Sequence, residues 1–381
     1  MHLSSRIRRP VGLLLGLALL AWPVAGPARA ADKPTKVQFD TGDGVTLQGS
    51  WYASPKGKDE PTVLLLHKTG SDSHKDGWDG LASKLQDKGY SVLSFDFRGH
   101  GNSTSVDTKF WDARVFPWNS KGIKGGGLDS KGKPKDSINQ KDFNPGYLPY
   151  LVNDIAAAKM FLDDRNDAGE CNSRSIIVIG AEDGAALGAL WMASEWSRCI
   201  ATVTPGLAGP RIGPPYEDPE GKGQYAAVWL SLTPALGGKM SVAGGLHNWL
   251  GLVGKDKKVP MGFLYGDGDE AGKTHAADYI RIIKGSDPKD SKLVFTASTA
   301  IKDTKLTGSA LLRDSLDTEQ KILNYLSQVR EKNVPHKWSK VGLEGTVYVW
   351  TFSPNAAPII AKDEKSKVLK PVPLSRLGVG Q

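Results

Sequence analysis

Cysteine is scarce in this sequence, because Cys171 and Cys199 are the only two among 381 residues. No other Cys or His stands at ligand spacing around them, which excludes a cysteine-based zinc site, and we expect no bound metal and no cofactor. In an exported chain an even pair of cysteines favours a disulfide, with two free thiols as the alternative. A bridge would require the two Cα atoms to lie within about 7 Å of each other.

Long hydrophobic runs are absent after residue 30. Residues 1–30 combine the basic start "MHLSSRIRRP", the apolar run "VGLLLGLALLAW" and the ending "PARA". This is the pattern of a secretory signal peptide, cleaved after Ala30. The alternative is an uncleaved anchor, but an apolar run of about 12 residues is shorter than the roughly 20 that span a bilayer. We expect an exported protein, periplasmic or extracellular, with no transmembrane segment after cleavage.

A strong excess of basic charge is also absent from the expected mature chain. The whole sequence has 49 Lys and Arg against 41 Asp and Glu, a net charge of +8. Four of the arginines and none of the acidic residues fall within residues 1–30, so the remainder carries +4. No basic stripe interleaved with aromatics and no nucleic-acid-binding motif is present, which argues against nucleic acid as a partner. A small molecule or a protein remains as the expected partner.

Strand and helix patterns alternate between residues 36 and 332. Continuous apolar runs predict strands buried on both faces, and each is followed by a helical pattern, so we expect an α/β fold with a doubly wound, mostly parallel sheet. An antiparallel pair precedes it. The predicted strands are 36–41, 46–54, 61–67, 91–97, 175–180, 226–234, 259–266 and 291–298, and the predicted helices are 78–90, 148–165, 184–197, 274–285 and 316–332.

Three stretches lack this alternation of strand and helix patterns. Residues 104–147 are rich in Gly, Lys, Asp and Asn, and a segment of this length predicts a lid over a site or a disordered insertion. Residues 205–224 read as a Pro/Gly-rich loop. Residues 334–381 read as a C-terminal extension with one strand, 345–352, and a loose tail. The expected organisation is therefore a signal peptide over 1–30, one domain over 31–333, and this extension.

Three motifs resemble those of the α/β-hydrolase fold superfamily over residues 36–332. "LLLHKTGSDS" (64–73) resembles the loop that supplies an oxyanion donor, and "FDFRGHGNS" (95–103) resembles a conserved glycine turn of that family. "VPMGFLYGDGDE" (259–270) resembles the strand before the acid of the catalytic triad, which would place Asp269 in that role. The resemblance implies an α/β-hydrolase fold and a Ser-His-Asp type of active site.

Serine is missing from the place where the resemblance expects the nucleophile. The strand "SIIVIG" runs into a helix through Gly180-Ala181-Glu182-Asp183-Gly184, which has the glycines of a nucleophile elbow around Glu182. A carboxylate nucleophile, Glu182 or Asp183 after a shift of one residue, is an alternative. Ser241 in "KMSVAGG" is a displaced candidate in a poor context, because Lys239 stands where a small residue is required.

Histidine is missing too. The family's histidine follows the last core strand, which corresponds to residues 296–314, and that stretch contains none. His67 and His100 match structural histidines of the two glycine turns, and we expect both imidazoles to be packed and hydrogen bonded. Without a histidine, a covalent ester on a carboxylate would not be hydrolysed readily. Asp269 then has no imidazole to orient, which favours a turn or cap role.

The expected oxyanion loop consists of His67, Lys68 and Thr69, with the backbone N–H of Asp183 as the second donor. Lys68 stands where the family has glycine, so a pair between Lys68 and Glu182 could fill the pocket. The hypothesis fails if the ammonium lies well beyond about 4 Å from the carboxylate. Plain surface charge is the alternative for both residues.

The sequence therefore favours an exported pseudoenzyme with a binding or scaffold role. One alternative is a hydrolase of esters, amides or alkyl carbons that uses Glu182 or Asp183 at the elbow. A second alternative is a structural, envelope-associated protein with the 104–147 insertion or the tail as its contact surface. Fold resemblance alone does not select a ligand in this family, which hosts many chemistries.

Overall fold

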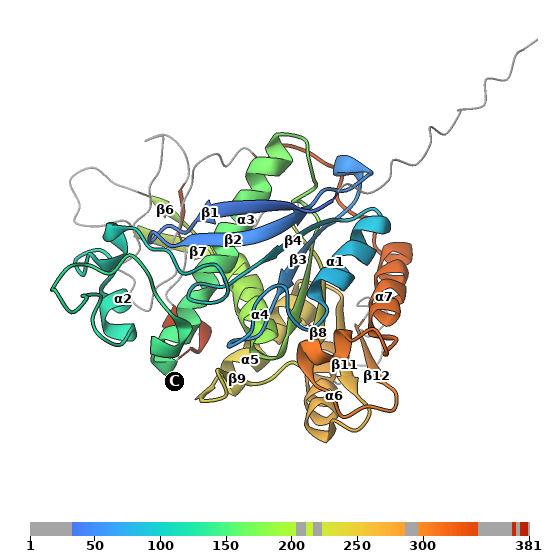
Figure 1. Cartoon of the computed structure of the whole chain (residues 1–381). Helices are drawn as coiled ribbons and strands as arrows, with labels where there is room; N and C mark the ends of the chain where they lie inside the picture. The colour runs from blue at the N-terminus through green and yellow to red at the C-terminus, as the bar shows by residue number, and fades with distance from the viewer. Residues whose placement is uncertain are drawn as a thin grey trace, which may run out of the picture. The chain divides into compact units, whose positions relative to one another are not determined.

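The computed structural model describes residues 33–202, 211–215, 223–285, 296–341, 368–370 and 374–379, all within the unit Ala31–Gln381 (Figure 1). The predicted signal peptide and the predicted strand at 345–352 lie outside the described residues. Among the helices that are described, none combines the length and apolarity needed to cross a membrane.

An eight-stranded sheet forms the centre of the fold, in the order β1-β2-β4-β3-β5-β8-β11-β12. The pairs β1–β2 and β2–β4 are antiparallel, and the pairs from β4 to β12 are parallel. This topology is that of the α/β-hydrolase fold, and it confirms the predicted fold class. The strands are β1 Thr35–Asp40, β2 Thr46–Tyr52, β3 Thr62–Leu66, β4 Ser91–Phe95, β5 Ile176–Ala181, β8 Gln224–Leu230, β11 Met261–Gly266 and β12 Thr296–Ile301.

Helices cover both faces of the sheet. They are α1 Trp78–Asp87, α2 Pro117–Gly122, α3 Val152–Asp167, α4 Glu182–Trp196, α5 Ala243–Leu250, α6 Glu270–Lys284 and α7 Thr318–Lys332. Alternate residues of a strand point to opposite faces. Leu64 and Leu66 of β3 accordingly pack in a core with α3, α4, α5 and α6, whereas Val63 and Leu65 pack in a second core with α1 and α7. The two cores hold β5, and with it the start of α4, in the middle of the fold.

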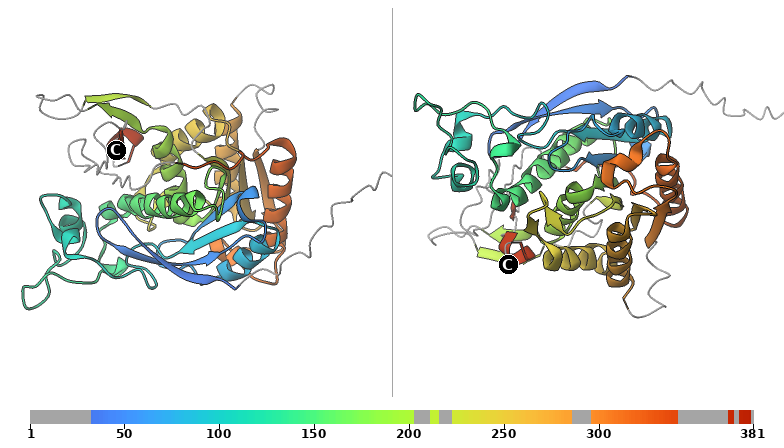
Figure 2. Two further views of the ribbon diagram at one scale, coloured as in Figure 1. Left: turned by 90° about the horizontal axis from the view of Figure 1, so that it is seen from above. Right: turned by 60° about the horizontal axis from the view of Figure 1, so that its bottom comes forward.

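The structure describes the 104–147 insertion as packed and ordered, unlike the disordered segment that was one of the two alternatives from the sequence. It contains α2 and the short helices η2 Thr108–Trp111 and η3 Gln140–Asp142, and it leads into η4 Pro145–Leu151. Several of its apolar side chains are buried in the larger core, among them Phe110, Phe116, Trp118 and Phe143. The remainder of the insertion extends away from the sheet, beside α2 (Figure 2). Scattered aromatics within a Gly/Lys-rich sequence are the signal that identifies it as packed structure.

Several smaller elements were not predicted. The expected loop at 205–224 contains β7 Arg211–Pro215, which pairs with β6 Cys199–Thr202, and β6 pairs with β13 Val368–Lys370. The segment after β8 contains the strands β9 Ala235–Leu236 and β10 Met240–Ser241, then α5, then the π-helical turn η5 Gly251–Asp256. Two further short helices are described, η1 Gly57–Asp59 and η7 Gly308–Leu312.

The described end of the C-terminal extension is packed, whereas the sequence predicts a loose tail. Helix η8, Leu374–Leu377, lies against α4 and α5. Leu374 and Val379 are buried, and the Trp249 indole N–H donates to the carbonyl of Leu377. These residues belong to the larger core.

Cys171 is buried and free, and its thiol contacts the carbonyl oxygen of Leu162 at 3.5 Å. The side chain of Cys199 lies outside the described residues, so the structure does not show the predicted disulfide. Burial raises the pKa of the Cys171 thiol to about 12, which keeps it protonated and unreactive.

Candidate functional site

The candidate site is the sharp turn from β5 into α4, where Glu182 occupies the predicted elbow position. Its φ of 49° lies in the left-handed region, which is uncommon for a residue with a Cβ. Glycine is required at positions 180 and 184, because neither position has room for a side chain. A Cβ on Gly180 would lie 2.7 Å from the Cα of Ala185, and one on Gly184 would collide with the carbonyl oxygen of His67. The backbone of a nucleophile elbow is therefore present without a serine.

The Glu182 carboxylate is held by two side chains. The Lys68 ammonium lies 3.2 Å from Oε1, and the Thr307 hydroxyl donates to the same oxygen at 3.3 Å. The predicted Lys68–Glu182 pair is confirmed. About a third of the Lys68 side chain (32%) and 22% of the Glu182 side chain remain exposed, so solvent screens the pair and its contribution to stability is modest.

The loop after β12 closes over Glu182 at the position where the resemblance expects histidine. Thr307 and Gly308 come from this loop, and Gly308 has a φ of 56°. Any Cβ on Gly308 would collide with the Glu182 carboxylate. The backbone of this loop therefore lies directly against the elbow carboxylate. The sequence analysis identified neither Thr307 nor Gly308 as a site residue. The one signal for them is that this loop follows the last strand of the sheet.

Asp183 uses its carboxylate to bind backbone. Thr69 N–H donates to Oδ1 at 2.9 Å, and Gly237 N–H donates to Oδ2 at 2.8 Å. The sequence predicted a backbone N–H role for Asp183, with a nucleophilic side chain as the alternative. Instead its buried side chain binds the Thr69 N–H of the expected oxyanion loop, so that donor is not free to stabilise a developing oxyanion.

His67 and His100 are structural, as expected. His67 Nδ1 lies 2.8 Å from the carbonyl of Lys68, and Phe97 N–H donates to His67 Nε2 at 3.0 Å, so the ring is neutral. Burial, together with the neighbouring His100, lowers the pKa of His67 to about 4. His100 Nδ1 lies 2.8 Å from the carbonyl of Arg98, and burial lowers the pKa of His100 as well. Both rings fix loops beneath the site.

Asp269 caps the N-terminus of α6. Gly272 N–H donates to Oδ1 at 2.9 Å, and the Ser231 hydroxyl donates to Oδ2 at 3.1 Å. These contacts fit the cap role that the sequence favoured for Asp269 over a triad role. Ser241 is exposed and pairs with Ala235 in the β9–β10 hairpin, away from any elbow geometry.

The remaining described histidines have contacts of their own. His74 pairs with Asp79, His247 pairs with Asp278, and His275 stacks on Tyr279. His336 binds through its backbone to Ser175 and Asn172. Over the described ranges, no hydrogen bond joins a histidine to Glu182 or Asp183, and no three His, Cys, Asp or Glu side chains gather as metal ligands would.

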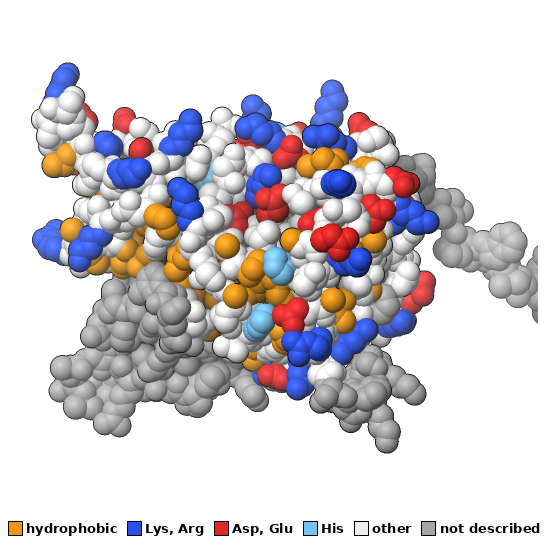
Figure 3. Space-filling model, turned by 90° about the horizontal axis from the view of Figure 1, so that it is seen from below, with side chains coloured by type: hydrophobic (Ala, Val, Ile, Leu, Met, Phe, Trp, Pro, Cys, Tyr) orange, Lys and Arg blue, Asp and Glu red, His pale blue; other side chains and the backbone are white. Residues whose placement is uncertain are grey.

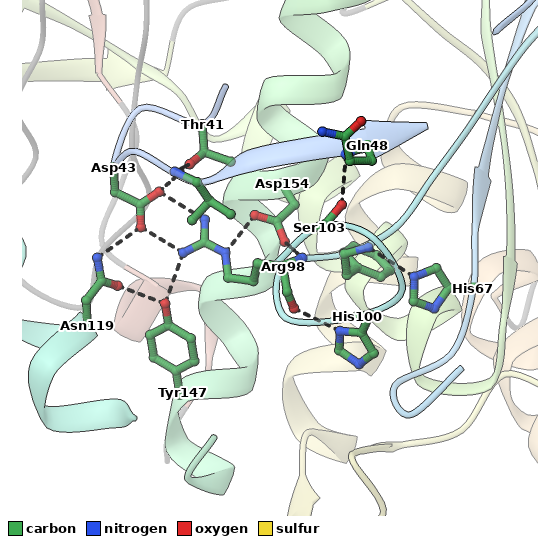
Figure 4. Close-up of polar contacts among 12 residues, drawn as sticks. Thr41, Asp43, Gln48, His67, Arg98, His100, Ser103, Asn119, Tyr147 and Asp154 are labelled. Carbon is green, nitrogen blue, oxygen red and sulfur yellow. Dashed lines mark hydrogen bonds and ion pairs between the residues drawn. The ribbon is translucent and has the colours of Figure 1, made fainter. Parts of the chain in front are cut away.

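A buried cluster around Arg98 anchors the glycine turn under the site (Figure 4). Arg98 makes a bidentate pair with Asp43, at 2.7 and 3.0 Å, and its Nε donates to Asp154 at 2.7 Å. The Tyr147 hydroxyl accepts from Arg98 and donates to Asn119, whose amide also donates to Asp43. All five side chains are buried, so the β1–β2 turn, the insertion and α3 meet at one guanidinium.

A cleft of about 480 Å³ opens above the elbow. Glu182 and Asp183 line it from below, and the insertion contributes Gln140. The other lining residues come from the expected oxyanion loop and from the segment after β8, namely Thr69, Gly70, Thr233, Ala235, Gly237 and Gly238. Most of the residues that line the cleft are thus small, with carboxylates at its base.

Comparison with known proteins gives similarity of structure alone. No family model matches the chain, and no curated protein matches it. An esterase from Pyrococcus furiosus superposes with a TM-score of 0.46 and 17% identity, over 78% of this chain and 90% of the other. A dienelactone hydrolase from Anabaena variabilis gives 0.46 and 14%, over 79% and 99%. An α/β serine hydrolase from Xanthomonas campestris, described as lacking a lid, gives 0.42 and 12%, over 78% and 94%. The fold assignment itself rests on the order and direction of the strands: the chain has an α/β-hydrolase fold.

Proposed function

We propose that the protein is an exported pseudoenzyme of α/β-hydrolase fold that binds a small molecule or a protein segment at the elbow cleft. One observation carries the proposal. The elbow carboxylate of Glu182 is bound by Lys68 and Thr307 and lies against Gly308, with no room for a side chain between them.

The chemistry of the elbow supports binding rather than turnover. An ester formed on a carboxylate needs an activated water for its release, and the described elbow has no imidazole bonded to it to provide one. In a catalytic triad the loss of one member typically costs a factor of about 10^4 to 10^6 in rate. Here neither the serine nor the histidine is in place.

No described contact supports the alternative of an enzyme with Glu182 or Asp183 as its nucleophile. Both oxygens of Asp183 accept backbone N–H groups, and the Thr69 N–H that would serve the oxyanion is one of them. Glu182 and Asp183 together with Lys68 leave the base of the cleft with a formal charge of −1. A ligand with hydrogen-bond donors or a positive charge therefore fits the cleft better than an anionic one.

Hydrolysis of short-chain aryl esters by the purified protein tests the proposal. We expect no turnover above that of Glu182→Ala and no labelling by a serine-directed phosphonate, because no nucleophile with a base stands at the elbow. Glu270→Ala, at an exposed glutamate outside the cleft, is the matched control. Turnover that Glu182→Ala abolishes and Glu270→Ala retains would make the protein an enzyme.

A further inference from the structure

A second surface stands apart from the cleft, on the part of the insertion that extends away from the sheet. We call residues 121–135 the basic arm. The arm contains five lysines and one acidic residue, Asp129, a net charge of +4 within 15 residues. The chain after Ala30 also carries +4 in total, so its other residues sum to zero. The excess positive charge of the expected mature protein is thus concentrated in this arm.

The arm has a defined backbone. Leu128 and Pro134 form a β-bridge, and Lys135 N–H donates to the carbonyl of Gly127 at 2.7 Å. The Trp111 indole N–H donates to the Lys135 carbonyl at 2.6 Å, and Gly127 packs so closely on the Trp111 ring that a Cβ would collide with it. The base of the arm is therefore fixed to the rest of the insertion by Trp111, together with a β-bridge between Ile123 and Phe143.

Asp129 does not pair with the lysines. Its Oδ1 accepts the backbone N–H groups of Lys131 and Lys133, both at 2.8 Å, and so shapes the turn. Four of the five lysines are exposed, and Lys135 is half-buried. The structure gives none of the five an ion pair in the described part of the chain. Lys and Arg side chains project at the left edge of the molecule in Figure 3, the side on which α2 lies in Figure 1.

An exposed apolar residue stands among these charges. Leu128, next to the turn of the arm, is 53% exposed, and Val115 in the same insertion is 37% exposed. Among the described residues the only other large hydrophobic side chain with comparable exposure is Val334. Two interactions bind a protein to the surface of an anionic bilayer: electrostatic attraction of basic side chains and shallow insertion of apolar ones. Unpaired lysines around an exposed leucine can make both.

We propose that the basic arm docks the protein on the surface of an anionic lipid bilayer. The lysines supply attraction to lipid phosphates, and Leu128 enters the interface between headgroups and acyl chains. The cleft is not required for this contact, so docking stands whether or not the proposed function of the cleft is correct. Because exposed charges are screened by salt, docking weakens as ionic strength rises.

Co-sedimentation with vesicles tests the proposal on the chain from Ala31, the unit that contains every described residue. Vesicles of phosphatidylglycerol and phosphatidylcholine should bind the protein, and pure phosphatidylcholine vesicles should not. The triple variant Lys124→Glu, Lys131→Glu, Lys133→Glu should bind about a hundredfold more weakly, from the usual contribution of each basic residue near an anionic surface. All three sites are exposed, so circular dichroism should show an unchanged fold.

A matched control variant makes the same change in net charge at three lysines outside the basic arm. Lys88, Lys302 and Lys340 are exposed and lie outside the insertion, and their exchange for Glu should leave vesicle binding within about threefold of wild type, since surface charges beyond a Debye length of roughly 10 Å are largely screened. Leu128→Gln should weaken binding to vesicles and leave binding to a soluble polyanion such as heparin unchanged.

Two results would overturn the proposal. Equal losses in the arm variant and the matched variant would mean that only overall charge matters. Binding to heparin or to DNA as strong as binding to vesicles, with no effect of Leu128→Gln on either, would mean that the arm binds a soluble polyanion.

Discussion

Glu182 keeps a backbone conformation that costs on the order of 1–3 kcal/mol for a residue other than glycine. Its φ of 49° persists because the turn is enclosed: Gly184 lies against the His67 carbonyl, and Gly180 lies against Ala185. The bond to Lys68 offsets part of this cost. The strain thus remains at a residue whose described contacts include no histidine.

His67 gives a prediction for the pH dependence of stability. Its folded pKa of about 4 lies below the ordinary value of 6.5, so the unfolded chain binds the proton more readily than the folded one. The contribution of the neutral His67 imidazole to the free energy of unfolding is fully present above about pH 6.5. As the pH falls from about 6.5 to about 4, up to roughly 3 kcal/mol of this free energy is lost. Urea unfolding of wild type and His67→Gln across this range should show a shallower decline in the variant.

His336→Gln provides the comparison for this experiment, because His336 is exposed and its two hydrogen bonds, to Ser175 and from Asn172, use only its backbone N–H and carbonyl. It should retain the wild-type slope of unfolding free energy against pH. A His67→Gln slope equal to that of wild type would show that the buried imidazole does not govern acid sensitivity.

At the elbow, the sequence predicted the residues that belong to recognisable motifs. Glu182 and Lys68 each depart from a motif at a known position, so their proximity could be inferred. Thr307 could not, because its contact with Glu182 joins residues 125 positions apart and no motif surrounds it. The side-chain bonds of Asp183 were also missed, since an aspartate in a helix's first turn has no fixed partner from sequence alone.

At the scale of elements, the C-terminal helix η8 is part of the larger core although the sequence around it reads as a tail. Leu374→Ala should therefore cost about 2–5 kcal/mol of unfolding free energy, the usual cost of a buried Leu-to-Ala change. Leu374 is fully buried and Leu128 is 53% exposed, so Leu128→Ala, the same substitution at an exposed site, should stay within about 0.5 kcal/mol. Urea unfolding of both variants measures the difference. Equal effects would mean that η8 contributes nothing to the core.

The strands and helices of the central fold were predicted because each carries a long apolar pattern. β3 and β5 are buried at every position, and their sequences are apolar runs to match. The prediction failed where elements are short or held by distant partners. β13 has three residues and exists by pairing with β6, and α5 begins in a Gly-rich stretch whose helix depends on the burial of Leu246 and Trp249.

For the whole molecule, export is the proposal that determines where the cleft and the basic arm operate. Cleavage after Ala30 would remove four arginines and leave the remaining chain with a net charge of +4, equal to that of the arm. N-terminal sequencing of the protein from the periplasm or medium should begin at Ala31. An intact Met1 on protein confined to the cytoplasm would contradict export, and a chain that retains residues 1–30 in the membrane would identify an anchor.

The Arg98 cluster also bears on the evolution of this chain. Asp43 from the hairpin turn and Tyr147 from η4 bind the guanidinium, and Asn119 of α2 bonds to both of these side chains. A deletion of the insertion would remove the Tyr147 hydroxyl from the guanidinium and the Asn119 amide from Asp43, and each buried polar group left without its partner costs about 1–3 kcal/mol. The insertion is therefore not an appendage that descendants can lose in one step. Lineages that keep Arg98 are constrained to keep the segment that carries the arm, whereas the arm's own exposed lysines remain free to vary.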